Sequence, residues 1–275
     1  MIPIAIRTFE RPFFLDITLK SLLASKIDQN QEIIIFDDCS QSEEANDYLF
    51  TNKEINIKNP IININFWETY VGQKQTHIKI VGLNNKITII RPNKRKGVRG
   101  FIFWIINYMM ENFPEADRIH IIEADCVFNE NWYLLSKKYY DDYKTIKNKN
   151  GDHIGLLSCY DRKCNKPDVS PGFRFRVVEK KDHTYNFSNG IGGVHYLISR
   201  ELYNRATPSF TKEYYIHSKS GDTELQSVCL NNNCTISVTA PSLIQHIGIE
   251  STAWPNKGWR YCKGFLKPYS WKDSI

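Results

Sequence analysis

The sequence predicts an α/β protein in which helices cover both faces of a mostly parallel central sheet. Short apolar runs rich in β-branched residues alternate along the chain with segments whose apolar residues recur at helical spacing. The strand-like runs are continuous, as expected for strands that are buried on both faces. Two of them end in paired acids, Asp37-Asp38 and Glu123-Ala124-Asp125. Because ligands of open α/β sheets bind at the carboxyl ends of the strands, this pattern also predicts where a site lies.

The first predicted elements are a strand, a helix and a second strand. Residues 2–7 form a β-prone run, and Arg11-Pro12 then opens a helical pattern over residues 13–23. Residues 32–36 are a β-branched run that ends at Asp37-Asp38. This order is a βαβ unit, which places two parallel strands in one sheet.

The middle of the chain continues the alternation. A polar stretch at residues 46–59 follows the opening unit, and a basic, glycine-bearing loop at residues 91–100 precedes a helix that stops before Pro114. The elements predicted here are strands at residues 61–66, 87–90 and 118–122 and a helix at residues 101–112.

The second half is predicted to be less regular, with a glycine-rich turn at residues 189–193 and an aromatic tail from Glu250. The elements predicted here are strands at residues 154–158, 173–178 and 236–239, a helix from residue 201, a helix at residues 221–230 and a strand-end segment at residues 241–248.

The composition excludes some classes of protein but does not identify a function. The 275 residues carry 36 Lys plus Arg and 30 Asp plus Glu, which gives a formal net charge of +6. A hydrophobic share of 41% excludes a disordered or collagen-like chain. The mild positive charge suits polyanions such as nucleic acid or nucleotide phosphates, and equally an ordinary soluble surface.

No apolar run reaches the roughly 18 residues of a membrane span, and the N-terminus lacks signal-peptide features. The simplest interpretation of the seven cysteines is that they are free thiols. We therefore expect a cytoplasmic protein.

The paired acids are candidates for binding a divalent cation. Carboxylates at one edge of a sheet repel one another unless a cation or hydrogen-bond donors neutralise them. Mn²⁺ and Mg²⁺ bind through one or two carboxylates together with phosphate oxygens of a substrate. Either pair alone could instead cap a helix or a turn. The presence of both pairs in one α/β frame favours a nucleotide site.

The loop at residues 93–100 is a candidate for binding phosphate. It places Lys94, Arg95, Lys96 and Arg99 at a helix start, where backbone N–H groups and the helix dipole favour anions. Neither the P-loop pattern nor the dinucleotide-binding glycine pattern is present. The alternative is a solvated basic loop.

Two residues late in the chain could complete a site. Asp222 stands at a predicted helix start, where it either caps the helix or takes a proton from an acceptor hydroxyl. His246 lies in a strand-end segment and is either a structural histidine or a metal ligand.

Taken in order, these features resemble a nucleotide-sugar glycosyltransferase of the GT-A fold, similar to the large inverting family 2. The resemblance spans about residues 1–250 and rests on the order and spacing of short motifs. These motifs are Arg7-Thr8, Arg11-Pro12, Asp37-Asp38, the loop at residues 93–100, Glu123-Ala124-Asp125, the glycines of residues 190–193, Gly221-Asp222 and the segment at residues 241–248.

The resemblance implies a GT-A type αβα sandwich with a Rossmann-like sheet. A nucleotide-sugar half would occupy about residues 1–128, and an acceptor half about residues 129–250. An aromatic tail at residues 251–275 would pack on the acceptor side.

The resemblance also implies roles for individual residues. Mn²⁺ or Mg²⁺ would bind Asp125 and His246, and Asp222 would be the catalytic base, with Glu224 as the second candidate. The acceptor side would include Gly192, Gly193, Trp254 and Trp259. The residues implied for the nucleotide sugar are Arg7, Thr8, Arg11, Asp37, Asp38, Arg95, Lys96, Arg99, Glu123 and Ala124.

Two positions depart from the family pattern. Glu123 stands where these enzymes carry the first aspartate of Asp-x-Asp, and Gly221 precedes Asp222 where a glutamate is usual. A glutamate at the first position still reaches a metal-bound water or a ribose. The glycine leaves the choice between Asp222 and Glu224 open.

The function predicted from the resemblance is metal-dependent transfer of a hexose or pentose from a nucleotide-diphosphate sugar, UDP-sugars foremost, with inversion. The acceptor hydroxyl would belong to a glycan or to a hydroxymethylated base of phage DNA. Two other classes fit parts of the sequence. A nucleotidyltransferase also uses Mg²⁺ and paired acids, although its glycine-rich N-terminal loop is missing here. A non-catalytic carbohydrate- or nucleic-acid-binding module is the other.

Overall fold

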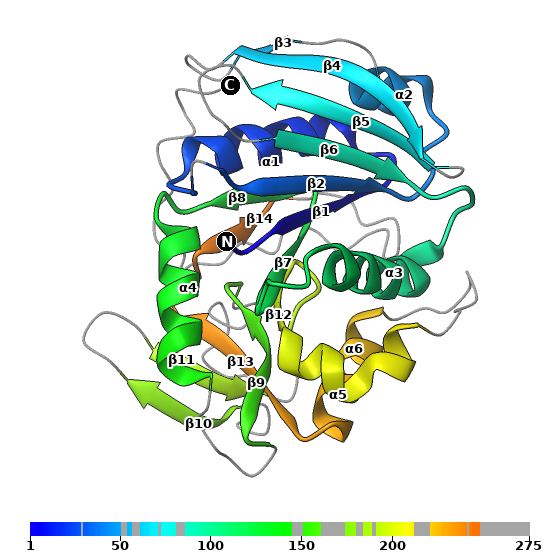
Figure 1. The fold of residues 1–275 in the computed structure, drawn as a ribbon. Coiled ribbons are helices and arrows are strands. Elements are labelled where there is room, and N and C mark those ends of the chain that lie inside the picture. The colour runs from blue at the N-terminus through cyan, green and yellow to red at the C-terminus, as the bar shows by residue number, and fades with distance from the viewer. Residues whose placement is uncertain are drawn as a thin grey trace, which may run out of the picture.

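A computed structural model describes residues 1–28, 30–50, 54–56, 61–70, 73–80, 86–144, 151–160, 174–179, 184–188, 191–211, 221–240 and 242–247. Its main feature is a sheet of 12 strands in the order β10-β11-β13-β9-β12-β7-β1-β2-β6-β5-β4-β3 (Figure 1).

The centre of this sheet is parallel. β1 (Ile4–Thr8) lies between β7 (Arg118–Glu123) and β2 (Glu32–Asp37), and β2 pairs in parallel with β6 (Lys86–Arg91). Outside this centre the strand pairs are antiparallel, except for the parallel pair of β9 and β13. The outer strands are β3 (Glu54–Asn56), β4 (Ile61–Tyr70), β5 (Gln73–Ile80), β9 (His153–Ser158), β10 (Arg174–Glu179), β11 (Thr184–Ser188), β12 (His195–Ser199) and β13 (Cys234–Ala240).

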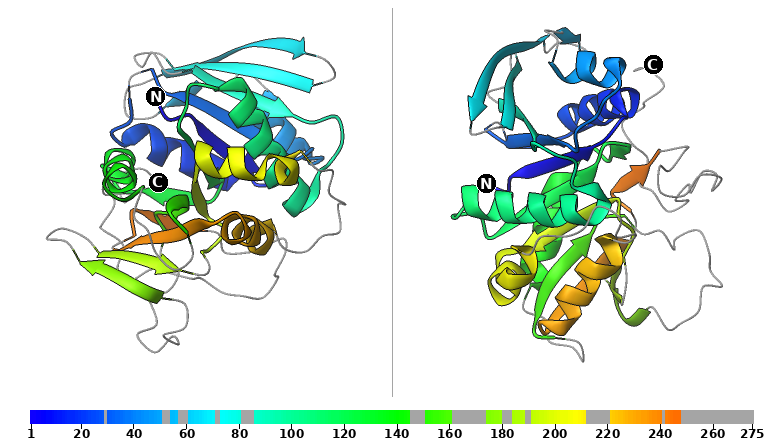
Figure 2. Two further views of the ribbon diagram at one scale, coloured as in Figure 1. Left: turned by 60° about the horizontal axis from the view of Figure 1, so that its bottom comes forward. Right: turned by 90° about the vertical axis from the view of Figure 1, so that its right-hand side faces the viewer.

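Helices cover both faces because the central strands direct alternate apolar side chains into two cores (Figure 2). In β1, Ile4 and Ile6 belong to one core and Ala5 to the other. The first core contains residues of α1 (Pro12–Ala24), α2 (Glu43–Phe50) and α4 (Trp132–Tyr143). The second contains residues of α3 (Gly97–Asn112), α5 (Arg200–Phe210) and α6 (Gly221–Asn231).

A second, two-stranded sheet carries a late segment of the chain to the central strands. β8 (Cys126–Phe128) follows β7 directly and pairs with β14 (Ile244–His246) in antiparallel fashion. The register sets His246 opposite Cys126, and the Ile247 N–H donates to the Asp125 carbonyl at 2.9 Å. Residues 242–247 therefore lie beside the acids that end β7.

The predicted α/β class is confirmed, with a parallel centre and helices on both faces. The predicted opening βαβ unit and the helix at residues 221–230 match β1, α1, β2 and α6 closely. The sequence did not predict seven of the described elements, which are α2, α4, β3, β5, β8, β11 and β12. The predicted tail at residues 251–275 lies outside the described residues. Among the described helices, none is both long and apolar enough to cross a bilayer.

Candidate functional site

Arg7 and Glu123 meet at the carboxyl edge of the sheet because their strands pair in register. Arg7 of β1 stands opposite Glu123 of β7, and its Nη2 donates to Glu123 Oε1. The same nitrogen donates to the Gly193 carbonyl at 2.7 Å. Burial alone would lower the pKa of Arg7, but the charges of Glu123 and Asp222 raise it. Arg7 is therefore a buried, permanently charged group at the centre of this edge.

Glu123, Asp125 and His246 form a cluster that could hold a metal ion. One ligand atom from each of the three residues lies within 4.8 Å of the others. His246 Nε2 is 3.0 Å from Asp125 Oδ2 and 3.8 Å from Glu123 Oε2. The two acids come from the end of β7, and His246 ends β14.

The surroundings of Asp125 fit a cation. This carboxylate has no exposed surface, and its Oδ1 has no hydrogen-bond partner among the described residues. Oδ2 contacts His246 and Arg11. Burial alone would raise the pKa of Asp125, but the hydrogen bond to His246 and the charges of His246 and Arg11 hold it below its usual value. An ionised oxygen with an unused lone pair, beside an imidazole and a second carboxylate, is a donor set suited to Mn²⁺.

The other two members of this cluster also have shifted pKa values. Burial alone would lower the pKa of His246, but the hydrogen bond to Asp125 and the two neighbouring carboxylate charges raise it. Burial raises the pKa of Glu123, and the charge of Arg7 opposes that effect. The cluster is therefore a set of strongly interacting groups, which is frequent at functional sites.

Asp222 reaches the same site from the first turn of α6. The Tyr196 hydroxyl donates to Asp222 Oδ1 at 2.6 Å. The carboxylate also packs against Gly193, where a Cβ atom would stand only 2.4 Å from Oδ2. The charge of Asp222 acts on both Arg7 and Glu123. The structure thus brings the predicted base close to the metal-binding cluster.

Asp38 caps α3. Its Oδ1 accepts the Lys96 N–H at 2.6 Å, and its Oδ2 accepts the Gly97 N–H at 2.9 Å. Burial raises the pKa of Asp38 to about 6, although these hydrogen bonds oppose the shift. The sequence predicted that N–H groups at this helix start bind phosphate. The N–H groups of Lys96 and Gly97 instead donate to Asp38. The loop offers its side-chain cations instead.

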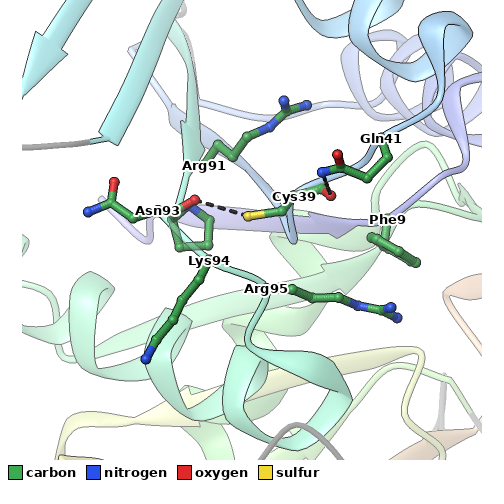
Figure 3. Close-up of a pocket in the computed structure, with 8 residues that line it drawn as sticks. Phe9, Cys39, Gln41, Arg91, Asn93, Lys94 and Arg95 are labelled. Atoms are coloured by element: carbon green, nitrogen blue, oxygen red, sulfur yellow. Dashed lines mark hydrogen bonds between the residues drawn. The ribbon is translucent and has the colours of Figure 1, made fainter.

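A pocket of about 510 Å³ lies beside this loop at the ends of β1, β2 and β6 (Figure 3). The Arg95 guanidinium lies over the Phe9 ring, 3.9 Å from its centroid. Cys39 also lines the pocket, and its Sγ donates to the Pro92 carbonyl at 3.0 Å. The remaining lining residues are Gln41, Arg91, Asn93 and Lys94.

Two residues next to this pocket hold a left-handed backbone conformation. The φ angle is 53° at Glu10 and 62° at Cys39. The Glu10 N–H donates to Ser40 Oγ at 2.8 Å, and Glu10 Oε2 accepts the Ser42 N–H at 3.2 Å, so the loops after β1 and β2 are joined. Such conformations cost on the order of 1–3 kcal/mol each and cluster at ligand sites. They support the pocket as part of the site.

The pocket and the metal-binding cluster are joined by one short connection. Phe9 lines the pocket, and Arg11, two residues later, contacts Asp125. Both belong to the segment between β1 and α1. The segment between β1 and α1 therefore contributes one residue to the pocket and another to the cluster.

Three predicted nucleotide-binding residues support the fold of this edge. Asp37 has no exposed surface, and its Oδ2 accepts the Ser40 N–H at 3.0 Å and Arg91 Nε at 2.6 Å. Both contacts lie within the protein and brace the loop after β2, and a contact of Asp37 with a nucleotide stays a prediction. Thr8 and Ala124 are also buried, and their backbones bond to Asp38 and Arg7, respectively.

Glu224, the second candidate for the base, forms an ion pair with Arg99. Arg99 Nη2 lies 2.7 Å from Glu224 Oε1 and joins the first turns of α3 and α6. The pair directs Glu224 toward α3 and engages a cation predicted to bind phosphate. Asp222 is therefore the better placed of the two carboxylates.

Some residues of the site were not predicted from the sequence. Tyr196 lies in the apolar strand β12, where a tyrosine is typical of a core, and no local motif marks Phe9 or Cys39. Gly193 contacts Arg7 and Asp222, and Gly192 precedes it in the chain, while Trp254 and Trp259 lie outside the described residues. The acceptor-side role of these four residues stays a prediction.

No family model and no curated protein matches the sequence. Solved structures with a similar fold include mannosyltransferase PcManGT from Pyrobaculum calidifontis in complex with GDP-Man and Mn²⁺, at 11% identity and a TM-score of 0.48. That match covers 86% of this chain and 56% of PcManGT. S. aureus TarS 1–349 in complex with UDP-GlcNAc matches at 13% identity and a TM-score of 0.48, over 94% of this chain and 57% of that one. The chain thus spans little more than half the length of either.

Proposed function

We propose that this chain is a metal-dependent glycosyltransferase that uses a nucleotide-diphosphate sugar as donor. One observation carries the proposal: a pocket, a cluster of residues able to hold a metal ion and the Asp222 carboxylate lie along one carboxyl edge of a parallel sheet. The order of motifs in the sequence, which resembles inverting GT-A glycosyltransferases, supports the same assignment.

The donor would lie along this edge from the pocket to the cluster. The pocket beside Phe9 and Arg95 would take the nucleoside, because an aromatic ring and a guanidinium plane offer stacking surfaces to a base. Arg11 stands between pocket and cluster and would face the diphosphate. A uridine nucleotide is the expected donor, with a hexose or a pentose as the transferred sugar.

Asp125 and His246 would hold Mn²⁺ or Mg²⁺, with Glu123 as a third carboxylate at the cluster. The ion supplies positive charge against the departing diphosphate when it is bound. Asp125 brings an unshared, buried Oδ1 to this task, and Arg7 keeps Glu123 in place through its ion pair.

Asp222 would act as the general base. Its carboxylate takes the proton of the acceptor hydroxyl while the acceptor oxygen bonds to the anomeric carbon. The bond from that carbon to the diphosphate oxygen breaks in the same displacement, so the nucleoside diphosphate leaves and the sugar is inverted. Glu224 is turned toward Arg99 and would not share this role.

A donor screen tests the proposal. The protein is incubated with UDP-, GDP- and other nucleotide sugars in Mn²⁺, and slow release of the nucleoside diphosphate is measured. We expect release from one class of donor. Pyrophosphate release from a nucleoside triphosphate and a sugar phosphate, without hydrolysis of any nucleotide sugar, would instead identify a nucleotidyltransferase.

The screen extends to the acceptor. Glycans and hydroxymethylated DNA are added to the best donor, and transfer is followed by mass. The acceptor that accelerates donor consumption is the substrate class. Donor binding without hydrolysis or transfer would identify a binding module and would contradict the proposed enzyme.

A further inference from the structure

Asp222 is held from three sides by residues of other elements. Tyr196 of β12 donates to its Oδ1 at 2.6 Å, and Gly193, in the turn before β12, leaves no room for a side chain against the carboxylate. Arg7 of β1 bonds the Gly193 carbonyl at 2.7 Å and is electrostatically coupled to Asp222. These contacts restrict the orientation of the carboxylate.

The helix that carries Asp222 is fixed as well. Gly221 begins α6 against the first turn of α3, where a Cβ atom at residue 221 would stand 3.1 Å from the Val98 carbonyl oxygen. The ion pair of Arg99 and Glu224 joins the same two turns. Movement of α6 is thus restricted at the turn that presents the base.

The Tyr196 hydroxyl has a narrow role in this arrangement. Its side chain has no exposed surface, and the contact that the structure gives its hydroxyl is the one to Asp222. Burial and the charge of Asp222 raise the pKa of Tyr196, so the hydroxyl remains a donor. Its hydrogen bond to Oδ1 restricts the rotation of the Asp222 carboxylate.

We propose that Tyr196 is a positioning residue that holds the Asp222 carboxylate in the orientation in which it receives the proton of the acceptor hydroxyl. Gly193 supports the same orientation because it has no side chain, and any side chain at this position would displace the carboxylate. The inference rests on the proposed function, since it assigns a partner to the proposed base.

Tyr196→Phe tests this role because it removes only the hydroxyl. The expected result is a loss of about tenfold in kcat, comparable to one hydrogen bond to a charged group, with the donor KM unchanged. Tyr133→Phe is the matched control. Tyr133 is equally buried and donates to the Asp28 carboxylate at 2.9 Å, on the α1–α4 side of the sheet. It should keep the wild-type kcat.

A double-mutant cycle separates positioning from a general structural effect. In the Asp222→Asn background, Tyr196→Phe should leave the residual rate unchanged, because the hydroxyl acts through the base that is already missing. If the two losses multiply, Tyr196 does not act through Asp222 and the positioning role is wrong.

Gly193→Ala gives a second route to the same answer. Its Cβ would displace the carboxylate, and a shift of this size is expected to lower kcat by about a hundredfold.

Thermal melting of every variant checks folding. Wild-type kcat in a folded Tyr196→Phe or Gly193→Ala protein would overturn the inference while leaving the enzyme in place. Absence of any donor turnover in the wild type would overturn the proposed function, and the inference with it.

Discussion

Asp125 is the residue on which the proposed metal site depends most. It is fully buried, it contacts both His246 and Arg11, and its Oδ1 is unpaired among the described residues. Such an oxygen is costly to leave without a partner inside a protein. A bound cation would give it one, so metal binding and local stability are coupled at this position.

Asp125→Asn should abolish Mn²⁺ binding, because it removes the negative charge that faces the ion. Electron paramagnetic resonance of added Mn²⁺ measures the bound fraction directly. Asp117→Asn is a suitable control, since this acid is exposed and pairs with Arg118 at the start of β7, the end opposite to the site. Equal Mn²⁺ binding by wild type and Asp125→Asn would place the metal elsewhere.

Two buried histidines make a separate prediction. His195 Nε2 and His120 Nδ1 are 3.0 Å apart, and the Cys159 N–H donates to His195 Nδ1 at 3.0 Å. Burial lowers the pKa of His195 to about 3. The unfolded chain therefore binds a proton that the folded protein does not, and stability falls as the pH drops below the ordinary histidine pKa of about 6.5.

This one histidine should lower the free energy of unfolding by roughly 2 kcal/mol between pH 7.5 and pH 5. His195→Asn keeps an acceptor for the Cys159 N–H but does not titrate. Denaturant unfolding at both pH values should therefore show that the free energy of unfolding falls less in the variant than in the wild type. An equal loss in both proteins would contradict a neutral, buried His195.

At the scale of elements, α3 depends on a cap supplied by a different part of the chain. Asp38 follows β2 and accepts the Lys96 and Gly97 N–H groups at the helix start. Arg200 bonds the carbonyls of Met110 and Phe113 at the other end, at 2.8 and 2.6 Å. Both ends of α3 are thus held by side chains, which keeps its first turn fixed against α6.

Asp38→Ala should lower the free energy of unfolding by about 1–2 kcal/mol, because both N–H groups lose their acceptor. Asp38→Asn keeps one acceptor oxygen and should lose less. The urea concentrations at the unfolding midpoints of the two variants measure the difference in stability. If alanine and asparagine behave alike, the cap contributes little.

The elements also explain what the sequence could predict. β2 and β7 are continuous apolar runs with acids at their ends, and pairing of parallel strands brings such ends to one edge. α4 was missed because its sequence mixes aromatic, lysine and aspartate residues without a clear apolar face. β12 was missed because it directly follows a glycine-rich turn.

At the scale of the whole molecule, the fold brings some of the predicted site residues together. Asp125, His246 and Asp222 lie together, because β14 pairs with β8 and α6 packs on α3. Single residue types could not reveal that Asp37 bonds Arg91, or that Tyr196 bonds Asp222. Those facts depend on contacts between segments far apart in the chain, and no local pattern encodes them.

The most direct test of the whole account is the rate of nucleoside diphosphate release from the best nucleotide sugar in Mn²⁺, in EDTA, and after Mn²⁺ is restored. We predict turnover with the ion, loss of turnover in EDTA and recovery on addition of Mn²⁺. A rate that is the same in EDTA as in Mn²⁺ would contradict a metal-dependent transfer at Asp125 and His246.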